Sequence, residues 1–243
     1  MKQKAAVRYQ LRSYRNPILI FYGIILLVYV LLSTIVKVQI FIEDQDLTMN
    51  GLNIASVIFL FVCGLNSFKE DFNFFLQNGV SRRTQFTALC LIQPVVAVVM
   101  AAVDSFIARL IALFLPCESL FGMIYGGSLE AGFSGFLLQT AWMFCLYLFA
   151  LVLGYLITVL YYRMGTTLKV LVSVGVPVFC ALVLPLLDAI CGNRISGLLV
   201  QAAKTVFGLQ NGPKPLIGML FLLACTAVCG IFVRLLQRRA VLK

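Results

Sequence analysis

Six runs of apolar residues, each close to the length needed to cross a bilayer, dominate this sequence. A membrane-spanning helix needs about 20 predominantly apolar residues. The chain is 62% hydrophobic and 12% charged, whereas roughly a quarter of the residues in a soluble domain are charged. The sequence therefore predicts an all-α integral membrane protein with one transmembrane domain over residues 1–243. The six predicted spans are residues 17–36, 51–68, 87–103, 136–162, 170–189 and 216–233.

The charged residues are distributed unevenly around these spans. If the N-terminus lies in the cytoplasm, most of the 19 lysines and arginines fall on the cytoplasmic side, and most of the 9 acidic residues fall on or near the opposite side. An excess of basic residues in the cytoplasmic loops sets the orientation of a membrane protein. We therefore expect a multi-pass protein of the cell membrane with both termini in the cytoplasm. The net charge of +10 then reflects orientation in the bilayer and indicates no nucleic-acid partner.

The first 16 residues combine an apolar face with an adjacent basic stripe. This pattern predicts an interfacial helix that lies among the lipid headgroups, with Pro17 in the first turn of the first span. A disordered basic tail is the alternative. The apolar face contains Val7, Leu11 and Tyr14, and the basic stripe contains Lys4, Arg8, Arg12 and Arg15.

Residues 69–86, KEDFNFFLQNGVSRRTQF, form a charged segment between the second and third spans. Apolar residues at three- and four-residue spacing predict an amphipathic helix, which Asn78-Gly79 would end. Ser81 is placed to cap the following span. The segment is interpreted as a cytoplasmic docking helix for another protein, and the alternative is a simple turn with a few basic residues. The apolar face consists of Phe68, Phe72, Phe75 and Leu76.

A second amphipathic segment, within residues 192–213, precedes the last span. Its apolar residues follow the helical pattern from Ile195 to Leu209, but about 15 residues are too few to cross the bilayer. We expect it to lie on or re-enter the outer leaflet and to cap a pathway as an outer gate. The alternative is an ordinary helix on the membrane surface. The expected gate residues are Leu198, Leu199, Ala202 and Val206.

Residue types needed for common chemistry are missing from the sequence. There is no histidine and no Gly-x-x-x-x-Gly-Lys-Ser/Thr phosphate loop, so we expect no catalytic residues, no metal site and no ATP hydrolysis by this chain. Asp104 and Asp188 are expected about 25–30 Å from the inner ends of their spans, near the outer surface. No midplane carboxylate of the kind that drives secondary carriers is then evident.

The role of two glutamines and the pairing of two cysteines stay open. Gln93 and Gln139 are the more deeply placed polar residues, and they either line a pathway or form hydrogen bonds between helices. Cys117 and Cys191 both fall on the outer side, where a disulfide between them is neither required nor excluded.

Taken together, this order of elements resembles the membrane subunit of an ABC export system, of the class-two (type V) permease fold. The segment from Asn78 to Thr84 is similar to the short NG-S-R stretch that follows the docking helix in small permeases of Gram-positive bacteria. The resemblance implies two permease subunits, identical or different, bound to two separate soluble ATP-binding subunits. This chain would bind no cofactor itself, because ATP and Mg would belong to the partner ATPase. The implied substrates are peptides, antibiotics or lipid-like molecules.

The resemblance also implies roles for the docking residues. Phe72, Phe75 and Leu76 would fill a groove on the ATPase, and Asn73 and Asn78 would bond to its backbone. Arg82 and Arg83 would pair with acidic residues of the ATPase or with lipid headgroups. Two other classes stay open, namely a secondary carrier that works without an ATPase and a non-transporting immunity or assembly protein.

Overall fold

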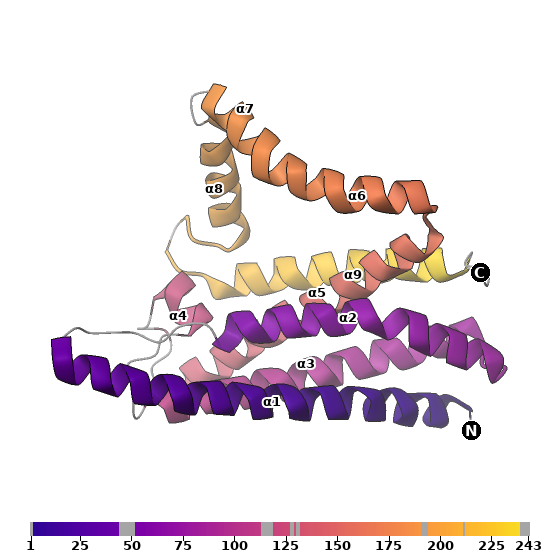
Figure 1. Ribbon diagram of the computed structural model, residues 1–243, viewed down its shortest axis with the longest axis horizontal. Coiled ribbons are helices and arrows are strands. Elements are labelled where there is room, and N and C mark those ends of the chain that lie inside the picture. The colour runs from indigo at the N-terminus through magenta and orange to yellow at the C-terminus, as the bar shows by residue number, and fades with distance from the viewer. Residues whose placement is uncertain are drawn as a thin grey trace.

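The computed structural model describes residues 2–43, 52–112, 119–126, 129, 132–190, 194–210 and 212–238, with side chains described except at residues 2–6, 32–43, 52, 69–73, 76, 180 and 238. This described part of the chain is helical and contains no strand (Figure 1). The helices are α1 (Lys2–Glu43), α2 (Leu52–Gln77), α3 (Arg82–Ala112), α4 (Leu120–Tyr125), α5 (Gly132–Arg163), α6 (Thr166–Val178), the π-helical turn η2 (Phe179–Val183), α7 (Leu184–Ile190), α8 (Arg194–Val206) and α9 (Pro215–Arg238).

Five helices lie side by side and form a bundle, which we define as α1, α2, α3, α5 and α9 (Figure 1). A second unit, the arm, consists of α6, η2, α7 and α8 and extends away from the bundle. Both chain ends, the α2–α3 turn and the α5–α6 connection lie at the same end of the bundle. We call this the basic end, because its described arginines and lysine are Arg8, Arg12, Arg15, Arg82, Arg83, Arg163, Lys169 and Arg234.

Five helical segments are long and apolar enough to cross a membrane. They are Val7–Leu31, Arg82–Ala112, Gly132–Arg163, Thr166–Ile190 and Pro215–Gln237, and they match five of the six predicted spans. The remaining predicted span corresponds to the shorter apolar segment Asn53–Phe68 of α2. The predicted all-α, multi-pass class is therefore confirmed, while the number of six spans and the orientation stay predictions.

The predicted interfacial helix is not a separate element from the first span. Helix α1 runs without interruption through Pro17. The Tyr14 side chain is buried, and its hydroxyl lies 2.6 Å from the Ser67 hydroxyl of α2. Tyr9 stacks on Phe74 with ring centroids 4.3 Å apart. A proline inside a helix costs one backbone hydrogen bond, and these contacts with α2 hold the two parts of α1 in line.

Helix α5 is the centre of the bundle and packs against α2, α3 and α9. Its crossing with α2 depends on two glycines, because a Cβ on Gly154 would lie 2.3 Å from the Phe61 carbonyl oxygen and a Cβ on Gly64 would lie 2.3 Å from the Leu151 carbonyl oxygen. At the same crossing the Thr158 hydroxyl donates to the Leu65 carbonyl at 2.6 Å. Small residues of this kind let membrane helices approach closely.

The arm differs from the bundle in the burial of its side chains. No described residue of α6 or α7 is buried, although the segment is among the most apolar in the chain. The π-helical turn η2 lies between Pro177 and Pro185, where missing backbone N–H groups disturb the regular hydrogen-bond pattern. Asp188 accepts hydrogen bonds from the backbone N–H groups of Ile195 and Ser196, each at 3.0 Å, and thereby joins α7 to the start of α8.

Candidate functional site

The turn between α2 and α3 begins where the sequence predicts a helix stop. The backbone N–H of Asn78 donates to the Phe74 carbonyl at 3.1 Å, and Gly79 has a φ of 64°, which favours glycine. Ser81 accepts a hydrogen bond from the Thr84 backbone N–H at 3.2 Å and caps α3. The predicted stop signal and cap are both confirmed.

The predicted docking helix is not a separate element. Residues 69–77 are the last turns of α2, which continues to Gln77 because no helix-breaking residue occurs before Asn78-Gly79. Phe75 is only 2% exposed and packs with Ala88, Val7 and Val80. Its neighbour Phe74 is 39% exposed. The Phe75 ring, which was predicted to fill a groove on the ATPase, is thus covered by the chain itself.

The other predicted docking residues divide into two groups. The side chains of Phe72, Asn73 and Leu76 lie outside the described residues. Asn78 and Arg83 are exposed, and Arg82 is half-buried. The described surface of the turn is therefore polar and basic, with Phe74 at its edge.

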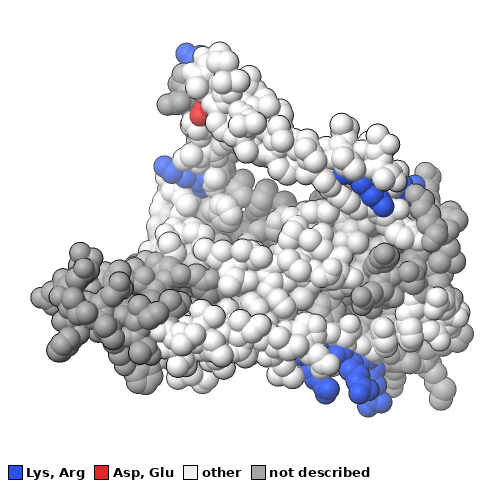
Figure 2. Space-filling model, viewed as in Figure 1, with Lys and Arg blue, Asp and Glu red and all other residues white. Residues whose placement is uncertain are grey.

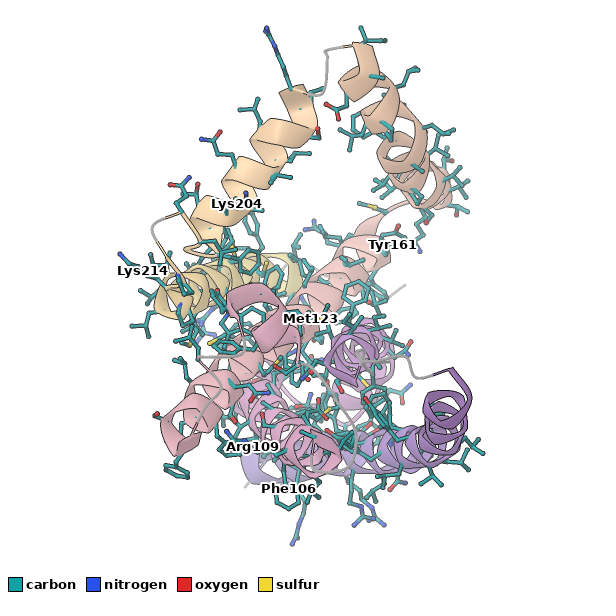
Figure 3. All side chains as sticks on the ribbon, turned by 90° about the vertical axis from the view of Figure 1, so that its left-hand side faces the viewer. Phe106, Arg109, Met123, Tyr161, Lys204 and Lys214 are labelled. Carbon is teal, nitrogen blue, oxygen red and sulfur yellow. The ribbon has the colours of Figure 1, made fainter. Side chains whose placement is uncertain are left out.

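The predicted outer gate is a helix, as expected, but it belongs to the arm. Leu198, Leu199 and Ala202 of α8 are exposed, and Val206 is half-buried. Helix α8 contacts α7 and α9, and Figure 3 shows α8, marked by Lys204, extending away from the bundle. The role of these residues as a gate stays a prediction.

The arm is tied to the bundle at both of its ends. At the basic end, the hydroxyls of Tyr161 and Ser173 lie 3.0 Å apart. At the other end, α8 contacts α9, and just after α8 the Phe207 carbonyl accepts a hydrogen bond at 2.9 Å from the hydroxyl of Tyr125 in the short helix α4. Burial raises the pKa of Tyr125, which keeps the hydroxyl protonated as a donor. Between these two ties, α6 and α7 have no buried residue.

A carboxylate cluster inside the bundle is the least expected feature. Asp104 of α3 is 0% exposed. The Tyr22 hydroxyl of α1 donates to its Oδ1 at 2.7 Å, and the Tyr147 hydroxyl of α5 donates to its Oδ2 at 2.5 Å. Ser56 of α2 is fully buried and faces the same carboxylate. Within the described part of the chain no lysine or arginine forms an ion pair with Asp104.

Counts of residues along the surrounding helices give different depths for Asp104. Along α3 the residue lies about 33 Å from Arg82. However, Ser56 lies only about 18 Å along α2 from Phe68, and Tyr22 lies about 10 Å along α1 from Arg15. The depth of Asp104 in the membrane therefore stays a prediction, whereas its burial between helices is a finding. A side chain predicted at the outer surface is enclosed by four helices.

The sequence contained a signal that could have identified this cluster. Asp104 is the only acidic residue in α3, and an isolated carboxylate in a long apolar run is a functional candidate by itself. Its partners come from distant positions in the chain, so the sequence gives no indication of them. Both carboxylate oxygens have phenolic donors, an arrangement that can hold a negative charge or exchange a proton.

A crevice between α3, α5 and α9 lies closer to the basic end. It has a volume of about 370 Å³ and is almost entirely apolar. Gln93 lines it, but the side-chain amide nitrogen is buried in protein with no hydrogen-bond partner among the described residues. Gln139 is also buried, in α5, and does not line the crevice. The structure therefore does not bring the two predicted pathway glutamines together in this space.

A second cavity, of about 580 Å³, adjoins the crevice and is basic. Phe86 and Arg234 line both spaces. The Arg234 guanidinium lies over the Phe86 ring, 5.4 Å from the ring centroid, within the distance of about 6 Å that defines a cation–π contact. The residues around the basic cavity are Arg82, Arg83, Phe86, Thr87, Arg234 and Gln237.

Among the described residues no group of three or more histidine, cysteine, aspartate or glutamate side chains could hold a metal ion. Cys117 and Cys191, for which a disulfide was left open, lie outside the described residues. No protein family, no curated protein and no solved structure matches this chain. The site must therefore be interpreted from its own geometry.

Proposed function

We propose that this chain is the membrane permease subunit of an ATP-driven exporter in the bacterial cytoplasmic membrane. The observation that carries the proposal is the exposed, basic turn between α2 and α3, which suits docking to a soluble ATPase subunit. The proposal includes six spans, with α2 as the second, and cytoplasmic termini. The clustering of arginines and Lys169 at the basic end supports this orientation. In Figure 2 most of the described surface in view is white and uncharged, and the blue basic side chains lie in separate groups toward its edges.

The length and packing of α2 support a docking role for the turn. The apolar segment of α2 ends at Phe68, and the helix continues for about 13 Å to Gln77. Contacts from α1 hold this extension, since Tyr9 stacks on Phe74 and Phe75 is buried beside Val7. A rigid extension transmits a push from a soluble partner to the spans. In this proposal Phe75 stiffens the extension, and the exposed turn contacts the partner.

The arm supports the presence of a second permease subunit. A long apolar segment with no buried residue leaves a large surface that lipid or another subunit must cover. A pair of subunits would place the two arms or bundles against each other. The substrate classes, namely peptides, antibiotics or lipid-like molecules, follow only from the resemblance to the export family.

The test is affinity purification from native membranes through a tag on the C-terminus, followed by identification of bound proteins and an ATPase assay. We expect a stoichiometric soluble ATPase. Gln77→Trp adds bulk at the exposed tip of α2 and should remove the ATPase, whereas Gln201→Trp, at an exposed position of α8, should not. Recovery of the chain without any ATPase, or an ATPase that both variants retain, would refute the docking proposal.

The Asp104 cluster favours a second candidate, a secondary carrier driven by protons or cations. Buried carboxylates without a cationic partner are typical of ion relays in membranes. This candidate predicts flux in proteoliposomes that contain only this chain, driven by a pH or sodium gradient and abolished by Asp104→Asn. Absence of such flux, together with an ATPase partner, would exclude it.

A further inference from the structure

We propose that the crevice between α3, α5 and α9, together with the adjoining basic cavity, binds one anionic phospholipid from the leaflet at the basic end. The proposal does not rest on the transport function. It follows from the juxtaposition of an apolar crevice with a cavity that carries three arginines.

The basic cavity has the chemistry of a phosphate site. Arg82 and Arg83 come from the start of α3, and Arg234 comes from the end of α9, so the charges converge from two helices. None of the described residues that line this cavity is acidic. Thr87 and Gln237 add neutral polar side chains at its wall. Basic pockets between helices on the cytoplasmic side of membrane proteins bind anionic lipid headgroups.

The crevice has the dimensions of an acyl-chain site. Its lining residues on α9 extend from Thr226 to Arg234, about 12 Å along the helix. One leaflet of the hydrocarbon core is about 15 Å thick. The wall is apolar, with Leu89, Val152 and Ile231 among its residues. A chain in this crevice would lie roughly parallel to its neighbours in the leaflet.

The two spaces are connected at Phe86 and Arg234, which line both. The cation–π contact between these residues holds the Arg234 guanidinium at the boundary between apolar and polar space. This is where the phosphate of a membrane lipid would meet its hydrocarbon part. A free phosphate ion would use only the basic cavity and would leave the crevice empty.

The test uses the full chain, purified in a mild nonionic detergent and titrated with phosphatidylglycerol or phosphatidylcholine, with bound lipid counted by native mass spectrometry. We expect one tightly bound phosphatidylglycerol and no retained phosphatidylcholine at the same concentration. Arg83→Gln combined with Arg234→Gln should weaken phosphatidylglycerol binding roughly 30-fold, since each basic residue near the surface contributes about fivefold. Arg163→Gln combined with Lys169→Gln removes two charges from the same end outside the cavity and should have roughly threefold effect or less.

A second pair of variants tests the crevice without changing charge. A Cβ on Gly230, which lines the crevice, or on Gly23 of α1 would meet no atom within 4 Å. Gly230→Leu should therefore fold and should displace the acyl chain, whereas Gly23→Leu should not. The thermal midpoint of each variant in lipid-free detergent verifies folding.

Three results would overturn the proposal. The first is equal retention of phosphatidylglycerol and phosphatidylcholine. The second is an equal loss of phosphatidylglycerol binding in the two double variants that each remove two charges, which would indicate nonspecific attraction. The third is displacement of phosphatidylglycerol by millimolar inorganic phosphate combined with no effect of Gly230→Leu, which would indicate a phosphate site. None of these results depends on an ATPase, so they leave the proposed function to its own test.

Discussion

The close crossing of α2 and α5 gives the sharpest prediction about stability. An alanine at position 154 would place its Cβ 2.3 Å from the Phe61 carbonyl oxygen and 3.1 Å from the Leu65 backbone nitrogen. Both of these atoms belong to backbone, so no side chain can rotate to make room. The two helices must therefore separate by about 0.7 Å or more before the contact reaches an acceptable distance.

The magnitude follows from three effects. Overpacking of this kind typically costs about 1–3 kcal/mol. The Thr158 hydroxyl bond to Leu65, now 2.6 Å long, would stretch as the helices separate, and an interhelical hydrogen bond in a membrane is worth about 0.6 kcal/mol. The higher helix propensity of alanine offsets up to about 1 kcal/mol. We therefore expect Gly154→Ala to lower the free energy of unfolding by roughly 1–3 kcal/mol.

The assay is thermal or denaturant unfolding of the purified chain in detergent. Gly230→Ala is the matched control, because it is the same glycine-to-alanine change in another helix of the bundle and its Cβ would meet no atom within 4 Å. It should be neutral or slightly stabilising. The double variant Gly64→Ala, Gly154→Ala should cost less than the sum of the single variants, since helices already separated by one Cβ accommodate the other. Equal stability of Gly154→Ala and Gly230→Ala would refute the reasoning.

Three further predictions concern the clusters and the turn. Tyr147→Phe leaves one buried oxygen of Asp104 without its donor and should lower stability by about 1–2 kcal/mol, measured by the same unfolding assay; an unchanged midpoint would argue against the bond. Phe75→Ala should cost about 3–5 kcal/mol because the ring is buried, whereas Phe74→Ala should cost far less, and the reverse order would place Phe75 on the surface. Ser81→Ala should cost about 1 kcal/mol through loss of the α3 cap, and Ser81→Asp should restore it; failure of this rescue would contradict a capping role.

Local features of this fold could be predicted from the sequence. The apolar runs identify the helices, and Asn78-Gly79 with Ser81 identifies the turn between α2 and α3, because each depends on residues close together in the chain. The interfacial helix and the docking helix were predicted as separate elements, and both are continuous extensions of α1 and α2. An apolar face on a short helix does not say whether lipid, a partner or a neighbouring helix covers it.

Features that depend on distant pairs could not be predicted. Asp104 meets Tyr22 and Tyr147 across three helices, and the chain separates it from Tyr22 by 82 positions. Counting residues along one helix also assumes that the helix is perpendicular to the membrane, and it says nothing about whether the Asp104 side chain faces lipid or neighbouring helices. The junction between the apolar crevice and the basic cavity likewise needs Phe86 and Arg234, which approach each other only in the folded bundle.

The two candidate functions assign different roles to α3, and variants in and beside this helix can distinguish them. In the exporter, force enters at the turn beside Arg83, and the Asp104 cluster is a fixed tie that makes α1, α3 and α5 move together. Asparagine at position 104 could still accept one of the two phenolic hydrogen bonds, so ATP-driven transport should survive with reduced stability. In a carrier, the same carboxylate must gain and lose a proton or cation, and asparagine cannot do so. Transport that survives Asp104→Asn but not Gln77→Trp therefore supports force entering at the α2–α3 turn, and the opposite pattern supports ion coupling at the carboxylate.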